Sequence, residues 1–64
     1  MEFVYNVYLK RKEDNDYNLT GDKIKVNIPL KIGRMTTERQ YKFIAKIDKI
    51  EHGLENPNVY LTVN

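Results

Sequence analysis

The chain contains no cysteine and only one histidine, His52, among its 64 residues. The absence of cysteine excludes a disulfide framework and a thiolate metal site. One histidine is too few for the usual metal site of histidines and carboxylates. The three glycines are scattered, so they form neither a phosphate-binding loop nor a dinucleotide fingerprint. We therefore predict no metal, no cofactor and no cofactor-binding residue.

Long hydrophobic runs are also missing. No apolar segment approaches the roughly 18 residues that a membrane-spanning helix needs. The N-terminal segment MEFVYNVYLKRK lacks the basic region, hydrophobic block and small-residue cleavage site of a signal peptide. We expect a cytoplasmic protein with no membrane contact.

The chain lacks a strong excess of charge of one sign. Eleven Lys and Arg residues against nine Asp and Glu residues give a net charge of +2, far from the balance of a protein that coats DNA. With 41% apolar and 31% charged residues, the composition is that of one folded domain over residues 1–64. Its richness in Lys, Ile, Asn and Tyr is typical of an AT-rich genome, such as that of a low-GC bacterium or its phages.

The first segment with a regular pattern is residues 2–12. Alternate positions are apolar there, which predicts a half-buried strand with Phe3, Tyr5, Val7 and Leu9 on its inner side. The next segment, residues 13–22, is rich in Asp, Asn and Gly, which favour turns. We predict a loop over these ten residues.

Residues 23–32, KIKVNIPLKI, also alternate strictly, which predicts a second strand. Five apolar positions would form the largest contribution to the core: Ile24, Val26, Ile28, Leu30 and Ile32. Because Pro29 cannot donate a hydrogen bond to a neighbouring strand, we expect this strand at a sheet edge and the first strand in the middle.

Residues 36–53 fit two patterns. As a helix they place Phe43, Ile47 and Ile50 on one stripe with Leu54, and Thr37 with Gln40 has the spacing of a capping box. As a strand they place Ala45 and Ile47 on one side with Tyr41 and Phe43, but Ile50 then falls out of phase. The helical stripe is longer, so we predict the helix, although the isoleucines favour a strand.

The last segment, VYLTV, follows a break at Asn56, Pro57 and Asn58 and predicts a strand over residues 59–63. The order strand, strand, helix, strand predicts an α+β fold, in which one helix covers one face of a three-stranded, mainly antiparallel sheet. The alternative is a small all-β fold, a four-stranded barrel or meander.

Catalytic signals are weak. His52 could act as a general base with Asp48 and Glu51 near it, but a histidine in the last turn of a helix is explained by the helix dipole alone. The run EDNDYN lacks the glycine and the twelfth-position acid of a calcium loop. We predict no catalytic residue and no enzyme.

The outward side of the predicted sheet is rich in lysine and tyrosine. Aromatic rings stack on unpaired bases and lysines neutralise phosphates, so this side could bind single-stranded nucleic acid. A lysine-rich wet face is also the usual solvated back of a sheet. The candidate binding surface consists of Tyr8, Lys10, Lys12, Lys23, Lys25, Lys31 and Tyr60.

A chain of this size without catalytic groups acts in a cell mainly by binding. We therefore predict a non-catalytic protein that works through protein contacts, a regulator or inhibitor of the kind that phages and mobile elements encode. Tyrosine is enriched at interfaces, which makes Val4, Tyr8, Tyr17, Tyr41 and Tyr60 suitable anchors. A homodimer through an edge strand is one form of this function, and single-stranded nucleic-acid binding is the alternative.

Overall fold

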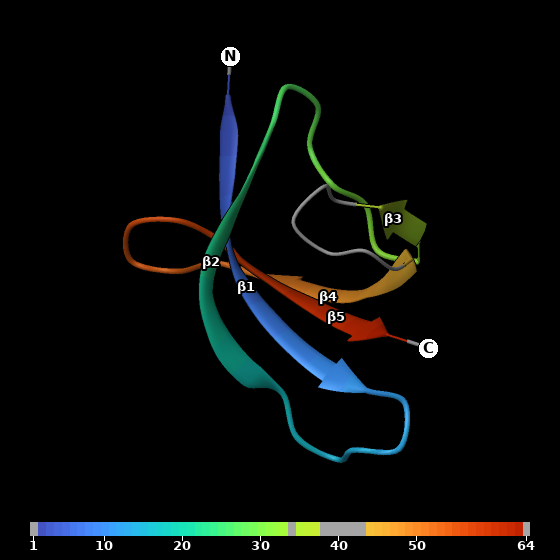
Figure 1. The fold of residues 1–64 in the computed structure, drawn as a ribbon. Coiled ribbons are helices and arrows are strands. Elements are labelled where there is room, and N and C mark those ends of the chain that lie inside the picture. Colours follow the sequence, from blue (N-terminus) through green and yellow to red (C-terminus); the bar gives the residue numbers. More distant parts are fainter. Residues whose placement is uncertain (1, 34, 38–43, 64) are drawn as a thin grey trace.

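The computed structural model describes residues 2–33, 35–37 and 44–63. These residues form one five-stranded sheet with the strand order β2-β1-β5-β4-β3 (Figure 1). The strands are β1 (Phe3–Arg11), β2 (Asn18–Val26), β3 (Met35–Thr37), β4 (Ile44–Glu51) and β5 (Asn58–Val63).

The two central strands come from opposite ends of the chain. β1 and β5 run parallel, with Val7 paired to Val59 and Leu9 paired to Leu61. β1 also pairs antiparallel with β2, and β5 with β4. Parallel neighbours need a long connection, and here the connection contains the three other strands. The centre of the sheet therefore forms only when both ends of the chain are in place.

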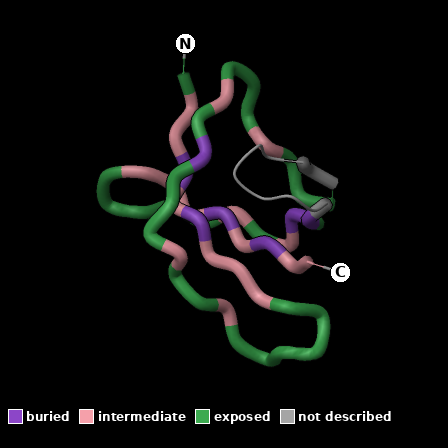
Figure 2. Tube along the Cα trace, in the orientation of Figure 1, coloured by how far each residue is buried: buried purple, intermediate pink, exposed green. Residues whose placement is uncertain are grey.

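One face of the sheet carries the core. Alternate residues of the strands point to opposite faces, and those buried on the inner face are aliphatic or aromatic. The buried residues lie along the middle of the sheet (Figure 2). They are Tyr5, Val7, Ile24, Ala45, Ile47, Val59 and Leu61.

The connection from β2 to β3 crosses from one edge of the sheet to the other (Figure 1). Two backbone amides hold it: Leu30 N donates to the Tyr5 hydroxyl oxygen at 3.1 Å, and Gly33 N donates to the Ile47 carbonyl oxygen at 2.8 Å. The side chain of Leu30 packs on the core. The inner face is thus covered in part by an irregular segment.

The predicted helix over residues 36–53 is wrong. Residues 36 and 37 belong to β3 and residues 44–51 form β4, while Gln40, Tyr41 and Phe43 lie outside the described residues. The sheet has five strands, so the predicted three-stranded sheet is wrong as well. The β1–β5 pair is parallel and the other three pairs are antiparallel, so the sheet is mainly antiparallel, as predicted. The described part of the chain contains no helix long and apolar enough to cross a membrane.

A β-bulge explains the misleading pattern. Ile47 pairs with Leu61 and Lys49 pairs with Tyr60, so Asp48 is an extra residue in β4. An extra residue shifts the alternation by one position. Ile50 returns to the inner face opposite Val59, three residues after Ile47 instead of two. This spacing of three is also the spacing of a helical stripe, and it led to the wrong prediction.

The predicted second strand over residues 23–32 is only partly correct. β2 ends at Val26, whose partner Phe3 is the first residue of β1, so no strand lies beside the residues that follow. Ile28 and Ile32, predicted in the core, are 74% and 63% exposed. β2 is an edge strand, but Pro29 lies beyond its end.

The loop predicted over residues 13–22 is shorter in the structure, because β2 begins at Asn18. The first half of β2, NLTGD, is mostly exposed and contains no alternation of apolar residues. Gly21 has a φ of 83°, a left-handed conformation, at an irregularity where Thr20 donates a side-chain hydrogen bond to the Val7 carbonyl oxygen. A strand of this kind leaves no pattern that sequence reasoning can detect.

Candidate functional site

The outer face of the sheet is polar and basic. Its charged residues are five lysines and two carboxylates, a net charge of +3 compared with +2 for the whole chain. The outer face, as the name is used below, consists of Val4, Asn6, Tyr8, Lys10, Leu19, Lys23, Lys25, Lys46, Asp48, Lys49, Glu51, Asn58, Tyr60 and Thr62.

Tyr60 lies at the centre of the outer face. It pairs with Tyr8 on one neighbouring strand and with Lys49 on the other. The Tyr8 and Tyr60 rings stack with their centroids 4.8 Å apart and their planes 20° apart. The Lys49 ammonium lies 4.4 Å from the centroid of the Tyr60 ring. Because the two partners come from opposite sides, the Tyr60 ring is held between an aromatic ring and a cation.

A third tyrosine joins from the loop between β1 and β2. Tyr17 packs edge-on against Tyr60, with centroids 5.1 Å apart and an angle of 76°. The Tyr17 hydroxyl donates to Asp48 Oδ2 at 2.8 Å, and the Lys10 ammonium lies 5.4 Å from the Tyr17 ring centroid. Tyr8, Tyr17 and Tyr60 are all partly exposed and are called the tyrosine cluster below.

The bulge in β4 is what brings charged groups to this cluster. Because Asp48 is the extra residue, its side chain and that of the next residue, Lys49, both reach the outer face. The Asp48 carboxylate accepts hydrogen bonds from Tyr17 and from the Thr62 hydroxyl. A regular strand would have directed one of these two residues into the core.

Glu51 provides the second carboxylate. The Tyr60 hydroxyl donates to Glu51 Oε1 at 2.5 Å, and the Lys49 ammonium lies 3.6 Å from Glu51 Oε2. The hydrogen bond from Tyr60 is the main reason why the pKa of Glu51 is below its usual value. The same bond, with smaller effects of burial and charge, raises the pKa of Tyr60 to about 12. For Tyr17, burial is the main cause of a raised pKa, and the bond to Asp48 is the second.

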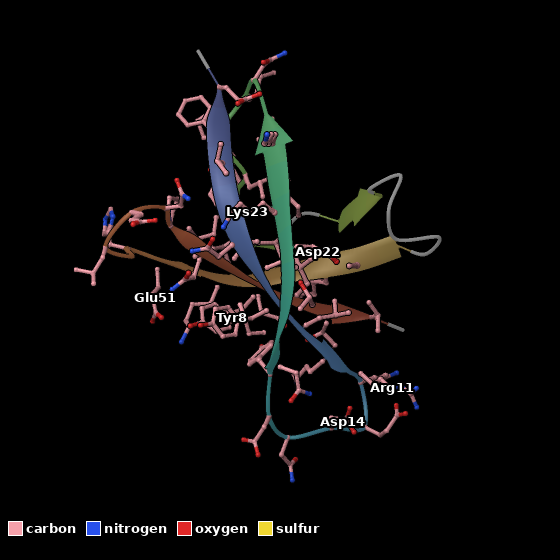
Figure 3. The ribbon with its side chains drawn as sticks, turned by 60° about the vertical axis from the view of Figure 1, so that its left-hand side comes forward. Tyr8, Arg11, Asp14, Asp22, Lys23 and Glu51 are labelled. Atoms are coloured by element: carbon pink, nitrogen blue, oxygen red, sulfur yellow. The ribbon has the colours of Figure 1, made fainter. Side chains whose placement is uncertain are left out.

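The side-chain amides of Asn6 and Asn58 extend the ordered region beyond the tyrosines. Asn6 Nδ2 donates to Asn58 Oδ1 at 3.0 Å, and the Lys23 ammonium donates to Asn6 Oδ1 at 2.9 Å. These side chains come from three neighbouring strands, β2, β1 and β5. The outer face is therefore connected by side-chain contacts across the sheet. Figure 3 shows Tyr8 and Glu51 on this face, with Arg11 and Asp14 apart from them at the loop after β1.

The structure brings together five of the seven residues of the predicted surface. Tyr8, Lys10, Lys23, Lys25 and Tyr60 lie on the outer face. Lys12 lies in the loop after β1, and Lys31 lies in the connection after β2.

Sequence reasoning missed Asp48, Lys49 and Glu51 as members of the outer face, because it placed them on a helix. One signal was available. The single break in alternation before Ile50 is what a bulge produces in an otherwise regular strand.

His52 follows β4 in an exposed loop, so the predicted placement in a helical turn is wrong. In the ranges that the structure describes, no group of three His, Asp or Glu residues is arranged to hold a metal ion. Comparison of the chain with protein-family models, with curated proteins and with solved structures finds no match.

Proposed function

We propose that the protein is a non-catalytic binding protein of the cytoplasm whose outer face docks on an acidic surface of another protein. The observation that carries the proposal is the fixed position of the Tyr60 ring between Tyr8 and Lys49. Tyrosine is enriched at protein interfaces. A ring that is already ordered loses little conformational entropy on binding.

Charge supports an acidic partner. The outer face has a net charge of +3, and Lys25 and Lys46 are exposed on strands at opposite sides of the tyrosine cluster. Complementary charge increases the rate of association and selects among partners. The absence of cysteine suits a reducing compartment, which supports a cytoplasmic location for this function.

The geometry favours a protein over a nucleic acid as the partner. Stacking on a base requires an open ring face, and the Tyr60 ring already has Tyr8 and Lys49 on its two sides. The carboxylates of Asp48 and Glu51 sit among the tyrosine hydroxyls, where they would repel a phosphate.

The test is affinity capture from host extract with charge-matched variants. The double variant K25E/K46E changes two lysines of the outer face, and K12E/K31E makes the same change in net charge outside that face. We expect K25E/K46E to lose a captured protein that wild type and K12E/K31E retain. Equal capture by both double variants would contradict the proposal, because the outer face would then not matter.

Single-stranded nucleic acid is the second candidate, favoured by the row formed by Lys10, Lys23 and Lys25 beside Tyr8. The test is a fluorescence titration of a labelled oligonucleotide. Binding through the lysines must weaken by orders of magnitude between about 50 and 200 mM salt. Absence of binding at the lower concentration would eliminate this candidate and leave the protein-binding proposal intact.

A further inference from the structure

A pocket of about 410 Å³ opens at the end of the sheet where β1 begins and β4 ends. The three rings of the tyrosine cluster do not line it, but Glu51, which accepts the hydrogen bond of Tyr60, does. Its apolar lining consists of Phe3, Tyr5, Pro29, Ile50 and Pro57. Pockets of this size hold a long side chain together with part of the backbone that carries it.

The wall of the pocket formed by residues 52–57 is a tight turn. A Cβ atom added to Gly53 would lie 2.2 Å from the Asn56 carbonyl oxygen. The backbone approaches itself so closely there that only glycine fits. A larger residue at position 53 would therefore displace this wall of the pocket.

The charged groups of the pocket are acidic. Glu51 and Glu55 line it together with His52, and none of the lysines and arginines that the structure describes does so. The carboxylate of Glu51 is already engaged by Tyr60 and Lys49. Glu55 is exposed at the pocket and is the carboxylate best placed to meet a ligand.

An apolar lining with an aromatic ring and an acidic rim is suited to a cation on an apolar stem. The methylene groups of arginine or lysine pack on surfaces such as Phe3 and Ile50 while the charged end stays near water. A guanidinium also stacks on aromatic rings and bonds carboxylates. The charge of the pocket thus selects a basic side chain.

Two exposed apolar residues indicate that this side chain belongs to a protein segment. Ile28, which precedes the lining residue Pro29, is 74% exposed, and Leu54, between Gly53 and Glu55, is fully exposed. A free amino acid in the pocket would leave both uncovered, whereas a peptide segment with apolar residues beside its basic residue would cover them.

We propose that this pocket binds an arginine side chain presented by a partner protein between apolar residues. The inference goes beyond the function proposed for the outer face, since the pocket shares only Glu51 with that face and would attract the opposite charge. Together the two sites would let one small domain contact an acidic surface with its outer face and a basic segment with its end.

The experiment is an NMR titration of the ¹⁵N-labelled protein with the peptide acetyl-Gly-Leu-Arg-Leu-Gly-amide. We expect saturable shifts at Phe3, Ile50, Gly53 and Glu55, with a dissociation constant on the order of 1 mM. The control peptide carries citrulline, which has the shape of arginine without the charge, and should bind about threefold more weakly. Equal binding of the two peptides, or shifts located elsewhere, would overturn the proposal.

Two protein variants test whether Glu55 is the carboxylate that attracts the arginine. E55Q should weaken binding of the arginine peptide about threefold, while E13Q, the same change in the loop after β1, should leave it unchanged. Equal effects of E55Q and E13Q would mean that only the net charge matters, which contradicts a defined site.

A third experiment tests whether the cation belongs to a protein segment or to a small free molecule. We expect the I28S/L54S variant to lose affinity for the peptide but to keep its weaker affinity for N-acetyl-arginine amide. If wild type binds the peptide no better than the amide, the pocket recognises a small free cation and the protein-segment part of the proposal fails. If the same NMR shifts appear when the concentration of the protein is raised without any peptide, a second copy of the chain occupies the pocket. That result would also overturn the proposal.

Discussion

The two faces of the sheet are ordered by different means. The inner face carries seven buried residues that exclude water, of which the most exposed, Tyr5, is 4% exposed. None of the outer-face residues is buried, and they are held by stacked rings, cation contacts and hydrogen bonds to two carboxylates. In the part of the chain that the structure describes, both sides of one sheet are thus ordered without a second layer of secondary structure on the outer side.

The two faces should also differ in how much each residue stabilises the fold. Removal of a large buried aliphatic side chain costs about 2 to 5 kcal/mol, because it loses burial and leaves a cavity. An aromatic pair contributes about 0.5 to 1.5 kcal/mol beyond its buried area. Substitutions on the inner face should therefore destabilise the protein more than substitutions on the outer face.

The largest effect is expected at Leu61, in the middle of the inner face. We expect Leu61→Ala to lower the free energy of unfolding by about 2 to 5 kcal/mol, which is a large part of the stability of a small domain. Urea unfolding followed by circular dichroism measures it. Leu54→Ala is the same substitution at a fully exposed site and should change stability by less than about 0.5 kcal/mol. Similar losses at both positions would refute the placement of the core.

The next effect is the coupling between Tyr8 and Tyr60. A double-mutant cycle with Tyr8→Ala and Tyr60→Ala should give a coupling energy of about 0.5 to 1.5 kcal/mol, because the rings stack. The same cycle with Tyr5 in place of Tyr8 should give less, since Tyr5 lies on the opposite face. Additive losses for Tyr8 and Tyr60 would mean that the outer rings do not interact in solution.

A smaller effect is expected at the bulge. Asp48→Ala removes the acceptor for Tyr17 and Thr62, whose hydroxyls can then bond to water. We expect a loss of about 1 kcal/mol in chemical denaturation. Asp16→Ala, in the exposed loop, is the matched control and should be neutral. A neutral Asp48→Ala would show that these bonds contribute nothing to stability.

The last prediction concerns pH. The pKa of Tyr60 is raised from 10.0 to about 12 in the folded protein, so the folded state keeps a proton that the unfolded state loses first. Stability from this group is therefore complete below pH 10 and is lost as the pH rises toward 12. Absorbance titration of the phenols should show Tyr60 losing its proton well above pH 10, and Glu51→Gln should move this step toward lower pH because it removes the carboxylate. An unchanged titration in that variant would contradict the role of Glu51.

The sequence predicted those parts of the fold in which alternation is unbroken. The first strand and the last strand, with Tyr8 and Tyr60 on one side, follow from periodicity alone. The second half of residues 23–32 alternates as well, yet Ile28 and Ile32 are exposed, because periodicity does not reveal whether a partner strand lies alongside.

The site was predictable to the extent that it lies on regular strands. The contribution of β4 was not, because the bulge at Asp48 gave its apolar residues a helical spacing. The parallel pairing of β1 with β5 was also beyond local reasoning, since it joins residues about 50 positions apart, as in the pair of Tyr8 with Tyr60.

The central claim is that Tyr60 is fixed on the outer face between Tyr8 and Lys49. The most direct measurement is a two-dimensional NOE spectrum of the protein in solution, with the aromatic rings assigned. We predict cross-peaks from the Tyr60 ring both to the Tyr8 ring and to the side-chain methylenes of Lys49. The account would be contradicted if the Tyr60 ring gave cross-peaks to neither residue. It would also be contradicted if the ring gave cross-peaks to the inner-face residues that surround Leu61.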